Sequence, residues 1–182
     1  MRFFTSDLHF GHKNVIPYCT RPFLDVDEMD RQLITNWNNT VHERDATWIL
    51  GDFSFYKPNK TLDILHQLKG EKILVKGNHD HGTTKCIGFP GYTAVFPAAE
   101  IRLDQRLPVL LSHYPYKTNE IDERFQERHM EDKGMWLLHG HVHQHWKTKN
   151  KMINVGVDVW DYKPVSEMEI LKIVEPIGSG EE

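Results

Sequence analysis

The chain has 182 residues, of which 39% are hydrophobic and 26% charged, and its formal net charge is −4. These values are typical of one globular domain with a sizeable core. No apolar run approaches the roughly 18 residues that a membrane span requires. The negative charge argues against a broad basic face, so we expect no stable complex with nucleic acid.

The N-terminus and the cysteines bear on the compartment. The chain opens with Met1 and runs quickly into polar residues, without the apolar core of a signal peptide. Cys19 and Cys86 are far apart and show no CxxC spacing. Free thiols without a signal peptide are typical of a reducing compartment. We therefore expect a cytoplasmic protein that does not associate with a membrane and is a monomer or a small homo-oligomer.

In the first half of the chain, predicted strands alternate with predicted helices. A short buried strand is predicted over residues 2–6, and Asp27 opens a helix whose apolar side chains recur close to the 3.6-residue period. A second strand is predicted over residues 47–50, a helix over 58–70 and a third strand over 72–76. This βαβαβ order predicts a largely parallel sheet with helical cover.

The second half is richer in predicted strands. They cover residues 92–96, 100–103, 108–112, 135–139, 152–157 and 167–174. One helix is predicted over residues 119–131. Many strands and few helices indicate a second sheet packed on the first, in a single domain over residues 1–176 with a flexible tail at 177–182.

Residue types that bind metals follow the predicted strands. They are Asp7 and His9; Asp52; Asn78, with His79 and Asp80; His113; and His141 and His143. In open α/β sheets, ligands bind beyond the carboxyl ends of the strands, so these loops can converge on one site. Carboxylates, imidazoles and a carboxamide, without a thiolate, suit divalent first-row ions.

The number of candidate ligands favours two ions that share a carboxylate. Asp7 and His9 lie two residues apart in extended chain, so both side chains can reach one ion, and His141 and His143 repeat this spacing. Two ions roughly 3.5–4 Å apart can hold a bridging hydroxide and stabilise in-line displacement at phosphorus. Two divalent ions, Asp7, a bridging Asp52 and the hydroxide sum to a charge of +1, which attracts a phosphate ester.

In this order the blocks DLH, GD, GNHD, SH and GHVH resemble the signature of the calcineurin-like metallophosphoesterases, and they span Asp7 to His143. The opening DLHFGHKNVIPYCTRPF resembles a small bacterial and phage branch of that superfamily. The resemblance implies an α/β fold, a four-layer αββα sandwich of two mixed β-sheets flanked by helices. One departure is that Phe53-Ser54-Phe55 follows Asp52 where many members carry a second acidic residue. That residue is not usually a ligand, so the ligand set is unaffected.

The resemblance also implies a role for each matching position. The first ion would be held by Asp7, His9 and His143. The second ion would be held by Asn78, His113 and His141. Asp52 would bridge the two ions. His79 would contact the phosphate and stabilise or protonate the leaving oxygen, and Asp80 would orient His79 through a hydrogen bond. Manganese is the first choice of metal, and Fe²⁺, Zn²⁺, Co²⁺ and Ni²⁺ also suit these ligands.

Other positions leave alternatives open. His12 lies just past the first block and could contact substrate. Arg21 could reach a phosphate or could anchor a loop. Asn14 could line the site or cap a short helix. Residues 147–151 read as a solvated hairpin turn, and residues 154–161 as a segment that packs a central strand, with Trp160 in the core or at its rim.

The leading functional hypothesis is a phosphodiesterase acting on a small phosphate ester or nucleotide, with in-line attack by a metal-bridging hydroxide. A diester leaving group is poor, so a proton source such as His79 favours this hypothesis mildly. A phosphomonoesterase or protein phosphatase is the alternative with the same residues. A nuclease is disfavoured by the negative charge, and a non-catalytic interaction module by the complete ligand set.

Overall fold

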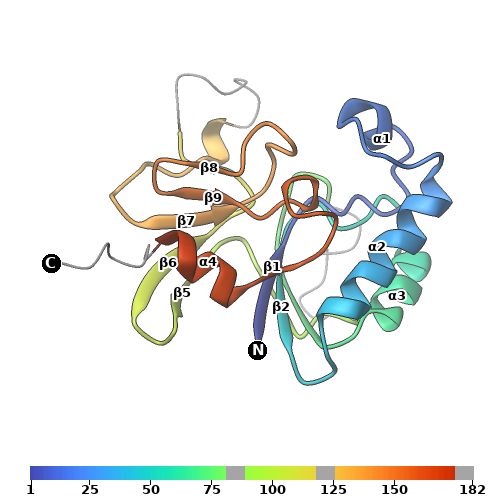
Figure 1. Cartoon of the computed structure of the whole chain (residues 1–182), viewed down its shortest axis with the longest axis horizontal. Helices are drawn as coiled ribbons and strands as arrows, with labels where there is room; N and C mark the ends of the chain where they lie inside the picture. The colour runs from blue at the N-terminus through green and yellow to red at the C-terminus, as the bar shows by residue number, and fades with distance from the viewer. Residues whose placement is uncertain (81–88, 118–125, 175–182) are drawn as a thin grey trace, which may run out of the picture.

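The computed structural model describes residues 1–80, 89–117 and 126–174. Two five-stranded mixed sheets pack against each other, and two long helices cover the outer face of the first sheet (Figure 1). The fold is therefore the α/β arrangement of two mixed sheets with flanking helices that the sequence predicted. The predicted tail at 177–182, and residues 119–125 of the predicted helix, lie outside the described residues.

The first sheet has the strand order β10-β1-β2-β3-β4. The strands are β1 (Arg2–Thr5), β2 (Ala46–Leu50), β3 (Glu71–Val75), β4 (Ala94–Phe96) and β10 (Val165–Ser166). Strands β1 to β4 are parallel, and β10 pairs antiparallel with β1. Because parallel strands end at the same edge, the loops after β1, β2 and β3 meet there.

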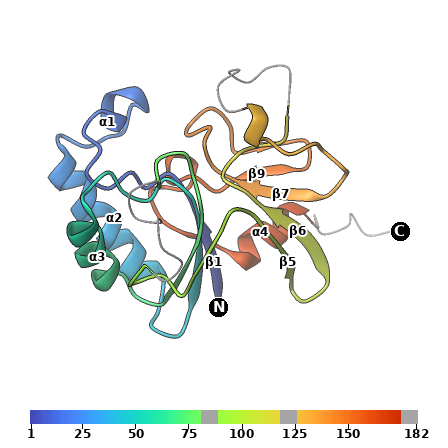
Figure 2. The ribbon, with the colours of Figure 1, turned by 180° about the vertical axis from the view of Figure 1, so that it is seen from behind.

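Helices α2 (Val26–Thr40) and α3 (Pro58–Gln67) cover the outer face of this sheet. The short α1 (Val15–Tyr18) lies beyond the carboxyl ends of the strands. The Asp25 side chain caps α2 by accepting a hydrogen bond from the backbone N–H of Glu28, at 2.8 Å. Met29, Leu33 and Trp37 of α2 are buried in one core with apolar residues of β1, β2 and β3. Figure 2 shows α2 and α3 on this side, away from the second sheet.

The second sheet has the strand order β5-β6-β7-β9-β8. The strands are β5 (Ala99–Leu103), β6 (Leu107–Leu111), β7 (Trp136–His139), β8 (Thr148–Lys149) and β9 (Met152–Asn154). The central strands β6, β7 and β9 are parallel, and the edge strands pair antiparallel with their neighbours. Residues 147–151 contain strand β8 and the turn that leads into β9, so they belong to a hairpin, as predicted.

The core between the sheets mixes side chains from both. Phe4, Leu50 and Val75 of the first sheet lie in one buried cluster with Leu111 and Leu138 of the second. On the outer face of the second sheet, a smaller cluster contains Tyr116, Leu137 and Met152. In the described part of the chain that covers this face, the helical structure is the single turn η1 (Gln126–Arg128).

The helix predicted over residues 119–131 is, in its described part, only the single turn η1 (Gln126–Arg128), and two predicted strands were wrong. The segment predicted as a strand at 167–174 is the helix α4 (Glu167–Val174). Glu169 Oε2 accepts from the backbone N–H of Ser166 at 3.0 Å, and the Glu169 N–H bonds back to Ser166 Oγ at 3.3 Å, which forms a reciprocal helix cap. Ile170 packs from α4 into the core between the sheets. A short apolar run has the same appearance in a strand and in a buried helix, and the cap decides here.

The other wrong prediction is a strand over residues 152–157. Strand β9 ends at Asn154, and the short helix η2 (Val157–Val159) follows. The Asn154 side chain accepts from the Gly156 N–H at 2.8 Å, which turns the chain out of the sheet. Trp160 is buried in the core and donates its ring N–H to the Asn154 carbonyl at 2.7 Å.

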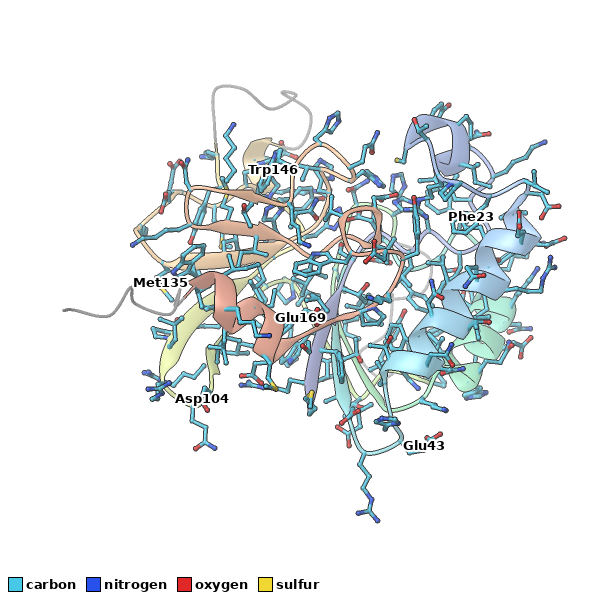
Figure 3. The ribbon with its side chains drawn as sticks, in the orientation of Figure 1. Phe23, Glu43, Asp104, Met135, Trp146 and Glu169 are labelled. Carbon is cyan, nitrogen blue, oxygen red and sulfur yellow. The ribbon has the colours of Figure 1, made fainter. Side chains whose placement is uncertain are left out.

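The two edges of the sandwich differ. Glu43 precedes β2 and Asp104 precedes β6, so both mark the edge where strands begin, whereas Phe23 and Trp146 lie towards the opposite edge (Figure 3). That opposite edge gathers the carboxyl ends of the central strands. Among the described residues, no helix has both the length and the apolar character needed to cross a membrane.

Candidate metal centre

All seven predicted ligands lie at the carboxyl edge of the two sheets. Asp7 and His9 follow β1, Asp52 follows β2, Asn78 follows β3, His113 follows β6, and His141 and His143 follow β7. The two sheets thus contribute to one cluster, which sequence spacing alone does not reveal. The resemblance predicts two ligand sets within this cluster, called the first and the second ligand set below, with Asp52 between them.

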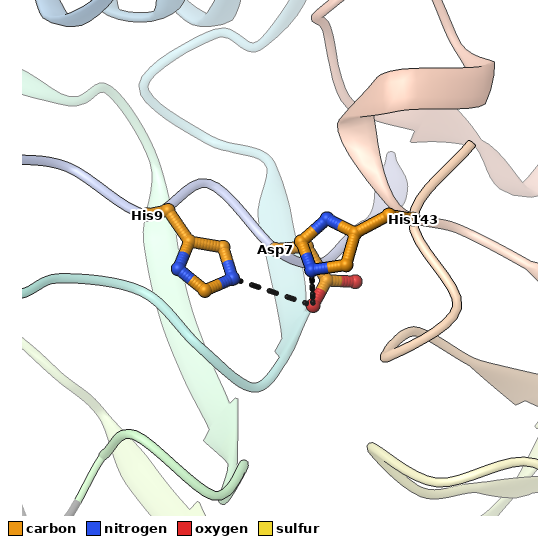
Figure 4. A group of neighbouring side chains, drawn as sticks. All are labelled: Asp7, His9 and His143. Carbon is orange, nitrogen blue, oxygen red and sulfur yellow. Dashed lines mark ion pairs between the residues drawn. The ribbon is translucent and has the colours of Figure 1, made fainter. Parts of the chain in front are cut away.

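The first ligand set is Asp7, His9 and His143 (Figure 4). Asp7 Oδ1 lies 3.8 Å from His9 Nε2 and 4.0 Å from His143 Nε2. Asp7 Oδ1 and His9 Nε2 are buried and have no hydrogen-bond partner among the described residues. A buried polar atom left unpaired costs about 1–3 kcal/mol. Two such atoms facing one another fit a site for a cation between them.

The second ligand set is Asn78, His113 and His141. His113 Nε2 lies 2.9 Å from Asn78 Oδ1 and 3.2 Å from His141 Nδ1. His113 Nδ1 lies 2.8 Å from the Leu50 carbonyl oxygen, which can only accept a hydrogen bond. The proton of a neutral His113 therefore sits on Nδ1, and Nε2 presents a lone pair to its neighbours.

Asp52 lies between the two sets. Its Oδ2 is 3.6 Å from His9 Nε2 of the first set and 3.6 Å from His113 Nε2 of the second. Its Oδ1 accepts from the backbone N–H of His79 at 2.9 Å, which fixes the carboxylate. Donor atoms at these separations could contact the same cation. One oxygen of Asp52 is therefore placed to serve both positions.

The backbone at these positions is strained. Five of the seven candidate ligands have positive φ angles between 47° and 70°, namely Asp7, His9, Asp52, His141 and His143. Side chains other than glycine adopt this left-handed region infrequently, and such conformations cluster at functional sites. Two glycines make room nearby. A Cβ on Gly77 would clash with the Asp52 carboxylate, and one on Gly140 with the Asp7 carboxylate.

The pKa values of Asp7 and Asp52 shift in opposite directions, although both carboxyl groups are buried. Burial alone would raise the pKa of Asp7, but the charges of His143 and His113 outweigh it and hold the pKa well below its usual value. At Asp52, burial dominates over the charge of His113, and the neighbouring charges of Asp7 and Asp80 add to it, so the pKa rises to about 7. A cation at the centre would reverse this second shift.

The imidazoles also split into two kinds. Burial lowers the pKa of His9 and of His141 to about 3, so both are neutral, which is the form that binds metals. For His143, burial is outweighed by the charge of Asp7 and a hydrogen bond to Asp158, and its pKa rises to about 11. A metal ion would therefore have to displace a proton from His143.

Comparison with known proteins accounts for this arrangement. The calcineurin-like phosphoesterase superfamily domain matches residues 3–165. The chain belongs to this superfamily. It is thus a metal-dependent phosphoesterase, and the family implies divalent ions at the clusters described above.

Relatives of this phosphoesterase span archaea, phages and bacteria. An uncharacterized protein of Methanocaldococcus jannaschii is 36% identical over 181 residues, which cover 93% of this chain and 89% of that protein. The gene 66 protein of Mycobacterium phage D29 is 34% identical over 186 residues, covering 91% and 92%. The crystal structure of a protein of unknown function from Aquifex aeolicus matches with a TM-score of 0.74 and 31% identity, covering 95% of this chain and 98% of the other.

The predicted catalytic pair of this phosphoesterase lies beside Asp52. The side chain of His79 is 45% exposed, and its Nε2 lies 4.0 Å from Asp52 Oδ2. Asp80 is buried, and its carboxylate accepts from the backbone N–H groups of Asp52, Phe53 and Gly77 at 2.7–3.1 Å. These bonds hold the loops after β2 and β3 together. The orienting bond from Asp80 to His79 stays a prediction.

His12 lies against the first ligand set. Its Nδ1 is 3.1 Å from His9 Nδ1, and its ring stacks on Phe55 with centroids 3.8 Å apart and an interplanar angle of 13°. Burial and the charge of His79 lower the pKa of His12 to about 4, so it can accept a hydrogen bond from His9. Asn14 precedes α1 but forms no side-chain cap.

Arg21 is buried, and its side chain is fully covered. It forms an ion pair with Asp158 of η2, which also contacts His143. This placement supports the loop anchor among the two roles considered for Arg21. Asp158 was missed by the sequence prediction, since it sits in an apolar segment with no motif around it. A buried acidic residue in such a segment was the signal available.

A cavity of ≈ 630 Å³ opens beside the first ligand set. Its lining includes His9, His12, Phe55, His79 and His143. This volume falls in the range of small-molecule sites. A small phosphate ester in this cavity would lie next to His79, to His9 and His143 of the first set, and to His141 of the second.

Proposed function

We propose that this phosphoesterase hydrolyses phosphodiester bonds of a small substrate, with phosphomonoesters as a second class, using two divalent ions. The observation that carries the proposal is the position of Asp52 Oδ2, which lies 3.6 Å from a nitrogen of each ligand set. A single carboxylate oxygen shared between two sets of neutral and charged donors fits a dinuclear centre better than two independent sites.

The proposed ligands fit divalent first-row ions. Asp7, His9 and His143 would hold the first ion, and Asn78, His113 and His141 the second. Manganese is our first choice, with Fe²⁺, Zn²⁺, Co²⁺ and Ni²⁺ as options that carboxylate, carboxamide and imidazole donors also suit. When bound, the two ions would supply positive charge for the phosphoryl oxygens and acidify the attacking water.

The protein itself would orient the substrate and handle the leaving group. His79 is half exposed at the cavity, next to the bridging carboxylate, so its ring can reach an oxygen of a phosphate placed over the centre. A nucleoside or alkyl leaving group is a poor one and benefits from a proton donor, which typically contributes about 10²–10⁴-fold. The ring of Phe55 lies beside that of His79, with centroids 4.6 Å apart, and lines the same cavity.

A monoesterase remains the alternative because the same residues can serve it. The test is to strip the protein of metal, restore Mn²⁺, and compare bis(4-nitrophenyl) phosphate, 4-nitrophenyl phosphate and a cyclic nucleotide. We expect metal-dependent turnover with a higher kcat/KM on the diesters. His66→Ala is the matched control for His79→Ala, because His66 is exposed on α3. Turnover that is confined to the monoester would refute the diester assignment, and no turnover of any ester would refute the proposal.

A further inference from the structure

Two residues with buried side chains, Arg21 and Asp158, lie outside the ligand sets. They connect His143 to the segment that carries Asp7 and His9, the other members of the first ligand set. Arg21 donates from Nε to Asp158 Oδ1 at 2.8 Å and from Nη2 to Asp158 Oδ2 at 3.0 Å, a fork-shaped pair. His143 Nδ1 lies 3.0 Å from the same Asp158 Oδ2. The three side chains form one chain of contacts that ends at a candidate ligand.

The remaining donors of Arg21 bind the backbone that carries the other ligands. Its Nη2 donates to the Asp7 carbonyl at 2.7 Å, and its Nη1 donates to the Leu8 carbonyl at 3.1 Å and lies 3.4 Å from Met29 Sδ. The five N–H donors of a guanidinium are thus all matched to acceptors. Asp7 and His9, which flank Leu8, both have φ of 54°, so this segment needs neighbours that hold it in place.

We propose that Arg21 and Asp158 are positioning residues that set the geometry of the first ion and leave the second ion unaffected. Asp158 holds His143 so that Nε2 faces Asp7, and Arg21 fixes Asp158 to the Asp7–His9 segment. Within the described residues, none of these contacts involves the second ligand set. This inference rests on the proposed dinuclear centre and assigns a selective role within it.

A purely structural role accounts less well for the pair. The side chain of Arg21 is 0% exposed and that of Asp158 1%. A buried ion pair pays a desolvation cost that often cancels its attraction, and well-packed apolar residues commonly replace such pairs without loss of stability. In the described part of the chain, the hydrogen bonds of these two side chains beyond their own pairing end on His143, on the ligand-bearing backbone or on Met29. Carboxylate contacts of this kind orient metal-bound histidines in other proteins.

The test measures Mn²⁺ binding, independently of turnover. Wild type, Asp158→Asn and Arg21→Lys are stripped of metal and titrated with Mn²⁺ by calorimetry, and the loaded forms are compared by electron paramagnetic resonance. We expect Asp158→Asn to weaken one Mn²⁺ by about 10–100-fold while the other keeps its affinity. At intermediate Mn²⁺ the exchange-coupled spectrum of the pair should give way to that of an isolated ion. Arg21→Lys keeps the charge but loses the fork, so it should show a smaller shift in the same ion.

The control is Arg2→Gln, which breaks another arginine–carboxylate pair at the start of β1, where Arg2 Nε lies 2.8 Å from Glu167 Oε2. It should leave both ions unchanged. Equal weakening of both ions, or unchanged affinities in Asp158→Asn, would overturn the inference. If Asp158→Asn does not fold, Arg21→Lys decides, and if neither folds the pair is a structural anchor and the inference is wrong. Failure of wild type to bind two Mn²⁺ would instead refute the dinuclear centre.

Discussion

Asp52→Asn is the sharpest perturbation of the proposed centre, because it should change metal binding and metal-free stability in opposite directions. Asparagine keeps the shape, and its carbonyl oxygen can still accept from the His79 N–H, which lies 2.9 Å from Asp52 Oδ1 in the wild type. The amide NH₂ then takes the place of Oδ2, which lies 3.6 Å from a nitrogen of each ligand set. A donor group there cannot bind a cation.

The loss of metal affinity should be large for both ions. Outer contacts of metal ligands are typically worth about 10–100-fold in affinity. Removal of a direct ligand should cost each ion at least the upper end of that range, about 100-fold. Both ions should weaken together, because the replaced oxygen lies between the two sets.

The metal-free protein should respond in the opposite sense. Burial raises the pKa of Asp52 from 3.8 to about 7, so the folded state binds more protons than the unfolded state between these values. Asp52 therefore destabilises the fold progressively as the pH rises through this window. The neutral asparagine has no such cost, so the metal-free variant should equal wild type near pH 4 and exceed it by a few kcal/mol at pH 8. Each kcal/mol corresponds to about 2–4 °C in melting temperature for a chain of this size.

The assay combines Mn²⁺ titration by calorimetry with thermal unfolding of metal-free protein at pH 4 and pH 8. Asp45→Asn is a control, because Asp45 contacts the N-terminal amine far from the centre. It should not affect Mn²⁺ binding. If Asp52→Asn binds two Mn²⁺ with wild-type affinity, Asp52 is not the bridge. A metal-free variant less stable than wild type at pH 8 would show that Asp52 contributes to the fold without metal.

Three further predictions use the same protein. His79→Ala should keep both Mn²⁺ ions and lose about 10²–10⁴-fold in kcat, more on an alkyl diester than on an aryl ester, and equal losses on both would reduce it to a binding residue. Mn²⁺ affinity should rise by about tenfold or more per pH unit from pH 6 to 7, because Mn²⁺ has to displace protons from Asp52 and His143. The pKa values of these two groups are about 7 and about 11. An Mn²⁺ affinity that does not change with pH would contradict this prediction. Gly77→Ala should displace the Asp52 carboxylate and weaken both ions, as measured by calorimetry, whereas the exposed change His66→Ala should not.

The first sheet could be predicted well from the sequence because its information is local. Strands β1, β2 and β3 are apolar runs closed by glycine or a polar residue, and helices with regular apolar spacing separate them. The candidate ligand positions followed from the same pattern, since parallel strands end at one edge of the sheet. That the second sheet brings its own ligands to this edge required the fold, or the resemblance, to be known.

The two strand predictions failed where hydrogen bonds at the ends of a short apolar run decide its secondary structure. Residues 167–174 form a helix because Ser166 and Glu169 cap it, and β9 stops because Asn154 turns the chain. Neither event changes the apolar pattern from which the strands were predicted. Such runs are ambiguous until the polar residues at their ends are matched to backbone groups.

Asp158 shows a different limit of the sequence. A candidate metal ligand can be found from its own neighbours in the chain, because the strand that it follows is adjacent in the sequence. The residue that orients a ligand is adjacent to it only in the folded structure, not in the sequence. Asp158 lies 15 positions from His143 and 137 positions from Arg21, yet contacts both at 3.0 Å or less. The Asp7–His9 segment, with its positive φ angles, is further still along the chain. We therefore expect local patterns to predict which atoms bind an ion, and only the fold to reveal which residues hold those atoms in place.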